Sequence, residues 1–177
     1  VERGEMANGT YEARPDSLPE PTLFRILDLE GKLVAGAPAP LLEPNERVAM
    51  YEAMVRARLL DAAIERMQRQ GRIGFYGTAK GQEGATLGTG AAFEARDWVF
   101  PALREMGVSL WRGTTLEEMV CQLIGNSGDV LKGRQMPCHF SDRRVRSVAW
   151  ASVIATQLPH AMGAAWASKL RREGTVS

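Results

Sequence analysis

The segment from Trp98 to Gly113, WVFPALREMGVSLWRG, constrains the fold more than any other stretch of this chain. Its first residues, Trp98–Phe100, are apolar and aromatic, which is typical of a short buried strand. Pro101 has no amide hydrogen and therefore ends a strand ladder or a helix. Arg104 thus follows the carboxyl end of a predicted strand, where open α/β sheets bind their ligands.

Two interpretations of Arg104 follow from its position. A guanidinium group at the end of a strand can make a two-pronged contact with a phosphate or a carboxylate. It can also pair with Glu105 or a helix end and have only a structural role. The spacing alone favours the structural pairing.

Composition excludes several classes of protein. The chain has 177 residues, of which 45% are hydrophobic, enough for one sizeable core. Its net charge of +1 predicts neither a nucleic-acid partner nor a membrane surface. No apolar run approaches the roughly 18 residues needed to cross a bilayer.

The two cysteines, Cys121 and Cys138, are predicted to be free thiols. No signal-like segment follows the amino terminus, so we expect a reduced, cytoplasmic chain. Cys138 and His139 are adjacent, but no second Cys/His pair completes a metal site.

Two regions are predicted, an arm at residues 1–44 and an α/β domain at residues 45–177. In the arm, apolar residues on both sides of Asp28–Gly31 indicate a β-hairpin. In the domain, helical patterns cover 45–70, 81–93 and 115–124, the last with a capping box. A fourth helix carries Pro159 in its first turn. The stripe expected to enter the core from the first helix is Val48, Tyr51, Val55, Leu59, Ala62 and Met67.

Further strands are predicted at Ser147–Trp150 and from Thr175 onward, which gives a parallel sheet flanked by helices. Three residues, Thr175–Ser177, are too few for a central strand. We therefore expect further chain, or a partner, to complete the sheet.

Four segments in order resemble one family: GRIGFYGTAKGQEGATLG, DWVFPALREMGVSLWRG, GNSGDVLKGRQMPCHFSD and IATQLPHAMGAAWASKLR. The family is that of the α subunits of thiamine-diphosphate-dependent 2-oxo acid dehydrogenases. The KGRQMP loop and the PTLFRILDLEGKLV segment favour the branched-chain (2-oxoisovalerate) type over the pyruvate type. The resemblance implies the amino-terminal part of a thiamine-diphosphate-binding fold.

The resemblance also implies an activity, cofactors and partners. The expected reaction is oxidative decarboxylation of a 2-oxo acid, with acyl transfer to the lipoyl group of a transacylase component. The cofactor is thiamine diphosphate with Mg²⁺, and much of the chemistry is the cofactor's own. Active sites are expected between α and β subunits of an α2β2 tetramer. The activating glutamate comes from the β subunit, so no catalytic residue is assigned to this chain.

Site residues are implied by match to the family's motifs. Cofactor-binding positions match Leu103, Arg104, Ser152, Val153 and Ile154. Substrate-binding positions match Phe75, Met136, Pro137 and His139. A structural potassium site matches Thr156 and Gln157.

Three departures from the family pattern affect this expectation. Leu103 replaces the usual tyrosine, and Ala151–Val153 replaces a Ser-Ser-Pro turn. The Gly-Asp-Gly segment that binds magnesium is expected just after Ser177. Because diphosphate charge is poorly compensated without the metal, we expect this chain alone to bind the cofactor weakly and to be inactive. Two alternatives stay open: part of an enzyme, or a non-catalytic subunit that acts in assembly.

Overall fold

The computed structural model describes residues 24–38 and 41–177, and the chain divides into two units, residues 1–41 and 42–177. Residues 1–23 of the expected arm lie outside the described residues. The division into an arm at 1–44 and a domain at 45–177 stays a prediction.

The described part of the first unit contains a turn around Gly31, whose φ of +77° suits glycine. The amide of Asp28 donates to the carbonyl of Lys32 at 2.9 Å, and Leu27 and Leu33 form an isolated antiparallel bridge. Within residues 24–38 no longer strand forms, so the hairpin arm is not confirmed. Both leucines are more than half exposed, so apolar burial adds little to a single bridge.

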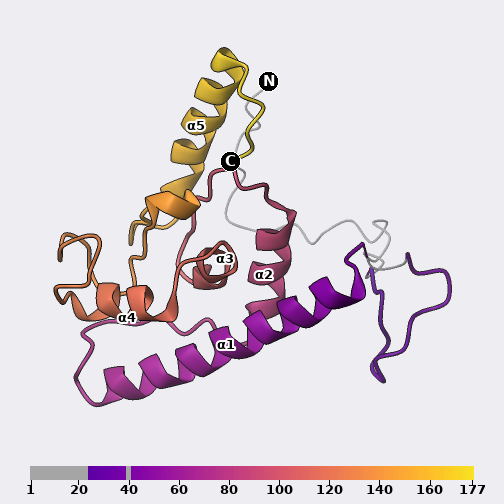
Figure 1. The fold of residues 1–177 in the computed structure, drawn as a ribbon, viewed down its shortest axis with the longest axis horizontal. Coiled ribbons are helices and arrows are strands. Elements are labelled where there is room, and N and C mark those ends of the chain that lie inside the picture. Colours follow the sequence, from indigo (N-terminus) through magenta and orange to yellow (C-terminus); the bar gives the residue numbers. More distant parts are fainter. Residues whose placement is uncertain (1–23, 39–40) are drawn as a thin grey trace, which may run out of the picture. The chain divides into compact units, whose positions relative to one another are not determined.

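The second unit is built from helices joined by long loops (Figure 1). Its elements are α1 (Pro44–Arg69), α2 (Glu83–Ala92), α3 (Met106–Trp111), α4 (Leu116–Ile124), the short 3₁₀ helix η1 (Arg143–Val145) and α5 (Gln157–Arg171). Helices α1, α2 and α3 pack against one another. The four helices predicted from the sequence are confirmed, whereas α3 and η1 were not predicted.

Local signals set the ends of these helices. A capping box of Glu43 and Glu46 begins α1, with Pro44 at its first position, one residue before the predicted start at 45. The predicted box of Thr115 and Glu118 begins α4 as expected. Gly125, in the left-handed conformation, ends α4.

The buried face of α1 is not the predicted one. Ala57, Leu60, Asp61 and Ile64 face the core, whereas most of the predicted stripe is exposed. Tyr51 and Leu59, for example, are 67% and 64% exposed. Both faces of α1 carry apolar residues at helical spacing. Contact with α2 and α3 therefore decides which face is buried, and periodicity alone does not contain that information.

Much of the core comes from the loops. The buried cluster contains Leu60, Ile64, Ile73, Tyr76, Ala79, Met106, Met119, Leu123, Cys138, Phe140 and Trp150. The segments 73–79 and 138–150 are thus held by apolar contacts although they contain little regular structure.

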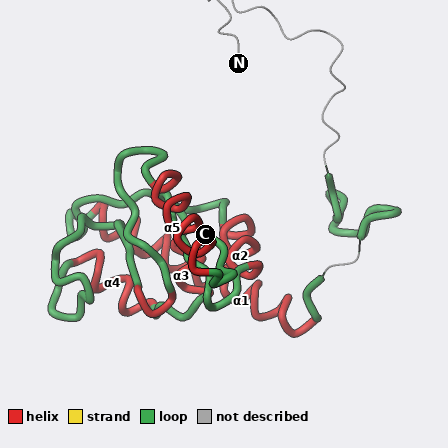
Figure 2. The backbone as a smooth tube through the Cα atoms, turned by 90° about the horizontal axis from the view of Figure 1, so that it is seen from above, coloured by secondary structure: helices red, strands yellow, loops and turns green. Residues whose placement is uncertain are grey.

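The predicted strands do not form within the part of the chain that the structure describes, which contains helices and loops (Figure 2). The segments nevertheless meet. The Val99 amide donates to the Arg146 carbonyl and the Val148 amide to the Val99 carbonyl, both at 2.9 Å, and Trp98 donates to Val176. The Val99–Ser147 bridge is parallel. Pro101, which has no amide hydrogen, and the left-handed conformation of Arg146 interrupt regular pairing beside these bonds.

Candidate functional site

A pocket of about 200 Å³ forms where three segments converge: the loop after α1, the turn before α3 and the segment before α5. Its lining contains five residues singled out from the sequence, namely Phe75, Leu103, Ser152, Ile154 and Gln157. It also contains Ala102, Trp150, Ala151 and Ala155, which were not among the predicted site residues. The wall is mainly apolar, with one hydroxyl and one amide group.

His139 joins the loop of residues 132–140 to this wall. Its ring is stacked on Trp150, with centroids 3.9 Å apart and planes 14° apart. Its Nε2 lies 2.7 Å from the Ser152 hydroxyl, and its Nδ1 lies 3.0 Å from the carbonyl of Pro137. The residue is 4% exposed, so it is held from several sides.

Local turns set the course of this loop. The carboxylate of Asp129 accepts the amides of Leu131 and Gly133 at 2.8 and 2.7 Å. Cys138, at φ +70°, turns the chain so that its own side chain enters the core and the next residue faces Trp150. Burial raises the pKa of the Cys138 thiol, which keeps it protonated. Both cysteines are free, as expected.

Arg104 follows Leu103 at the edge of the pocket and is exposed. Among the described residues, no hydrogen bond or ion pair engages its guanidinium group. The Glu105 carboxylate instead turns back on the main chain. Its Oε2 accepts the amides of Ala102, Leu103 and Arg104 at 2.9, 2.8 and 3.0 Å. The expected pairing of Arg104 with Glu105 therefore does not occur, and the guanidinium is available to an anion.

Six predicted site residues lie outside the pocket lining, namely Arg104, Met136, Pro137, His139, Val153 and Thr156. Met136 is 56% exposed and Val153 is 70% exposed, while Pro137 and Thr156 are half-buried. Pro137 does not contact the pocket itself, but its carbonyl oxygen is hydrogen-bonded to His139. Thr156 precedes the first residue of α5.

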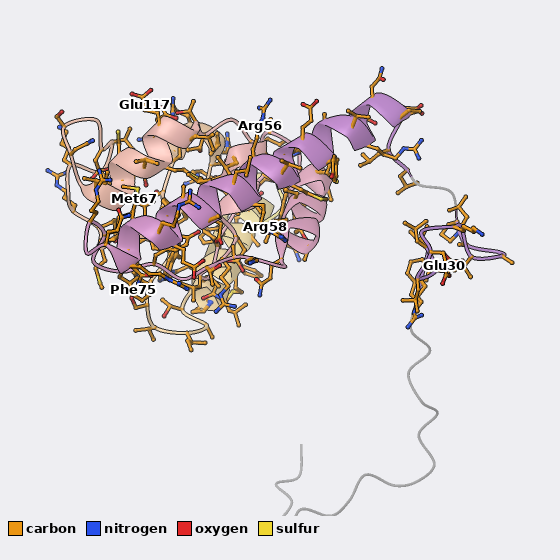
Figure 3. All side chains as sticks on the ribbon, turned by 90° about the horizontal axis from the view of Figure 1, so that it is seen from below. Glu30, Arg56, Arg58, Met67, Phe75 and Glu117 are labelled. Atoms are coloured by element: carbon orange, nitrogen blue, oxygen red, sulfur yellow. The ribbon has the colours of Figure 1, made fainter. Side chains whose placement is uncertain are left out.

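Beneath Phe75 lies a buried network that the sequence analysis missed. Asp61 of α1 is 1% exposed, and its carboxylate accepts the Tyr76 hydroxyl, the Thr78 hydroxyl and the Ala79 amide, each at 2.7 Å. Burial raises the pKa of Tyr76, and its hydrogen bond to Asp61 adds to that rise. The sequence signal that could have revealed this network is Asp61, an aspartate within the helical pattern at 45–70. Phe75 itself is 40% exposed, at the surface (Figure 3).

A second charged contact fixes the start of α2. Arg58, labelled on α1 in Figure 3, forms a two-pronged pair with Glu83, in which Nη2 lies 2.8 Å from Oε2. The hydrogen bond from Arg58 lowers the pKa of Glu83 to about 2. Glu83 also accepts the amide of Gly81 at 3.0 Å.

The donor set fits part of thiamine diphosphate. Apolar side chains and one hydroxyl suit a ring system, and the exposed guanidinium beyond them suits an anionic tail. No group of three or more His, Cys, Asp or Glu side chains that could hold a metal occurs among residues 24–38 and 41–177. None of the helices in those ranges is both long enough and apolar enough to span a bilayer.

Comparison with known proteins identifies the family of this chain. The family model described as dehydrogenase E1 component matches residues 51–177. A 2-oxoisovalerate dehydrogenase subunit alpha 2 of Arabidopsis thaliana is 39% identical over 150 residues, covering 85% of this chain and 32% of that protein. The alpha subunit of Caenorhabditis elegans is 37% identical over 158 residues (89% and 37%), and the human one 38% over 147 residues (83% and 33%).

Two facts qualify the likeness. The chain spans about a third of the length of these relatives. All three are named as mitochondrial, so the expectation of a cytoplasmic location is contradicted.

Proposed function

Since the chain belongs to the dehydrogenase E1 component family, we propose that it is the cofactor-binding α chain of a branched-chain 2-oxo acid dehydrogenase. The observation that carries the proposal is the pocket at Phe75, Leu103 and Ser152, beside the uncommitted guanidinium of Arg104. These residues are far apart in the sequence and match separate motifs of the family.

The proposed reaction is oxidative decarboxylation of a branched-chain 2-oxo acid, with transfer of the acyl group to a lipoyl group. Thiamine diphosphate, when bound, supplies the carbanion and the electron sink. The chain's own part is to bind and orient. Leu103, Ser152, Val153 and Ile154 are proposed to hold the cofactor, while Arg104 compensates the diphosphate charge.

The substrate side is proposed to consist of Phe75 and the loop that carries Met136, Pro137 and His139. Phe75 and Met136 are the exposed apolar members of this set, at 40% and 56% exposure. Large apolar side chains of this kind suit the branched aliphatic part of such a 2-oxo acid.

Metal ions and partners extend the proposal. Magnesium is proposed to accompany the diphosphate, with ligands from outside this chain. Thr156 and Gln157 are proposed ligands of potassium, because their oxygen atoms are hard donors. The proposed partners are a β subunit, in an α2β2 tetramer, and a lipoyl-bearing transacylase. The names of the relatives as α subunits support this assignment.

A parallel sheet with a preceding hairpin arm is the finer fold that we propose. The bonds from Val99 to Arg146 and from Trp98 to Val176 support adjacent strands at 98–100, 147–150 and 175–177. The bridge between Leu27 and Leu33 supports the hairpin.

A second candidate is a non-catalytic subunit that acts only in assembly. It is favoured by Leu103, which places an alkyl group in the pocket where the family usually has a tyrosine hydroxyl. The main proposal, the assembly role and a pyruvate-type dehydrogenase are separated by measuring the release of carbon dioxide from 2-oxoisovalerate and from pyruvate by the assembled protein. Turnover of 2-oxoisovalerate supports the main proposal, turnover of pyruvate alone supports the pyruvate type, and no turnover supports the assembly role.

The test of the cofactor site is Arg104→Ala in the whole protein assembled with its β subunit. Loss of a charge-assisted contact of about 1.5–3 kcal/mol predicts a rise in the Kd for thiamine diphosphate of roughly 10- to 100-fold. Titration calorimetry with Mg²⁺ present measures it. Arg47→Ala, an exposed arginine on α1, is the matched control. An unchanged Kd in the Arg104 variant removes this residue from the site.

A further inference from the structure

We propose that His139 is a positioning residue, which fixes the hydroxyl of Ser152 in the pocket wall and does not itself contact a ligand. The proposal rests on the function proposed above and specifies how the loop of residues 132–140 serves that site. It assigns His139 a role different from the substrate contact that the family resemblance implies.

The two ring nitrogens of His139 are both engaged by the chain. Nδ1 faces the carbonyl of Pro137 at 3.0 Å, and a carbonyl can only accept. Nδ1 of the neutral ring therefore carries the hydrogen, and Nε2 is an acceptor. The Ser152 hydroxyl, 2.7 Å from Nε2, must then be the donor in that bond.

Two aromatic side chains also lie against the ring of His139. One face is stacked on Trp150 at 3.9 Å, and Phe75 lies tilted against the ring at 6.3 Å between centroids. The residue is 4% exposed, and it is absent from the pocket lining, in which Ser152, Trp150 and Phe75 take part. His139 can thus influence the pocket only through these three neighbours, and Ser152 is the one that it hydrogen-bonds.

The arrangement determines what Ser152 can offer. Because the hydrogen of its hydroxyl is committed to Nε2, the oxygen presents only lone pairs to the pocket. A ligand group beside it must therefore be a hydrogen-bond donor, such as an amino group on the cofactor ring, and not a carboxylate of the substrate. The bond also couples the loop at 136–139 to the segment before α5.

A double-mutant cycle tests the proposal in the whole protein assembled with its β subunit. His139→Phe keeps an aromatic ring for Trp150 and removes the acceptor, and Ser152→Ala removes the donor. If His139 acts only through Ser152, each single variant raises the Kd for thiamine diphosphate, roughly five- to tenfold for one neutral hydrogen bond. The double variant then binds no more weakly than Ser152→Ala alone.

Effects that multiply in the double variant would overturn the proposal, because they indicate separate ligand contacts. His139→Gln, whose amide oxygen can replace the Nε2 acceptor, is expected to recover most of the affinity lost in His139→Phe. Failure to recover any would count against positioning through this bond. Absence of cofactor binding in the unsubstituted protein would instead overturn the proposed function itself.

Ser109→Ala is the matched structural control. Ser109 donates to Ser147 at 2.9 Å, is 4% exposed and lies outside the pocket lining. Its loss is expected to lower the thermal midpoint without changing the Kd for thiamine diphosphate. The His139 and Ser152 variants are expected to change both the thermal midpoint and the Kd. Non-additive changes of the thermal midpoint in the double-mutant cycle provide a second readout, which needs no cofactor.

Discussion

At the scale of single residues, one carboxylate oxygen sets the shape of the turn that leads to the pocket. Glu105 satisfies three consecutive amides, those of Ala102, Leu103 and Arg104. Successive amides that converge in this way form a small anion site, here filled by the chain's own side chain. In the proposed site, a diphosphate would therefore meet the guanidinium of Arg104 but not these amides.

Glu105→Ala leaves the three amides without their acceptor. We expect the free energy of unfolding to fall by about 1–3 kcal/mol, and the pocket wall at Leu103 to loosen. Urea unfolding measures the first effect and cofactor affinity the second. Glu117→Ala, an exposed glutamate in the first turn of α4, should change both by little, and an equal loss there would refute the assignment.

The ion pair of Glu83 gives stability a defined pH dependence. The folded-state pKa of Glu83, about 2, lies below its ordinary value of 4.5. The contribution of this ion pair to the free energy of unfolding is therefore complete above pH 4.5 and is lost as the pH falls toward 2. Arg58 is 46% exposed, so water screens the pair and we expect only a small contribution to stability. Glu83→Gln should flatten the fall in unfolding free energy between pH 4.5 and 2, and an unchanged slope would contradict it.

At the scale of elements, α2 and α3 approach so closely that glycine is required at the contact. A Cβ on Gly107 would lie 2.7 Å from the hydroxyl oxygen of Thr86. Gly90 similarly faces the backbone of Val108, with only 3.4 Å between a built Cβ and Cα. Gly90 of α2 and Gly107 of α3 therefore serve a close helix contact, and α3 was not predicted.

Gly107→Ala is expected to destabilise the fold by about 1–3 kcal/mol, because Thr86 must move and give up its bond to the Glu83 carbonyl. Gly88→Ala is the control, since a Cβ there meets nothing within 4 Å. A helical glycine with free space should gain about 0.5–1 kcal/mol on replacement by alanine. Thermal unfolding of the two variants should give shifts of opposite sign, and equal shifts would contradict the packing.

The sequence predicted those elements that depend on local signals. The capping box at Thr115 and the end of α4 at Gly125 are determined within a few residues. The buried face of α1 depends on contacts with distant segments, and so does the pairing around Val99. Motif resemblance pointed to Phe75 and Ser152, which line the pocket, whereas Trp150 and Glu105 carry no sequence signal for their positions.

At the scale of the whole molecule, large apolar side chains remain exposed along two helices of the second unit. On α5 they recur every fourth residue and are 58–69% exposed: Leu158, Met162, Trp166 and Leu170. On α1 the exposed members include Val48, Tyr51 and Leu59. Contiguous apolar surface of this kind favours association.

We therefore expect the 177-residue chain in isolation to self-associate. Its sedimentation coefficient should rise with concentration, and Met162→Glu with Trp166→Glu should reduce that rise. His160→Glu, an exposed polar position on the same helix, is the control. A coefficient independent of concentration would refute the prediction.

Asp61 has a consequence for how sequences of this family can vary. One buried carboxylate serves Tyr76, Thr78 and the Ala79 amide, so its replacement strands three donors at once. Replacing Tyr76 alone leaves the Asp61 carboxylate with one hydrogen-bond donor fewer. The side chains of Asp61, Tyr76 and Thr78 should therefore vary together within this family. Substitutions that are tolerated in combination should destabilise the fold when made singly, so the order in which they arise should decide whether the loop stays folded.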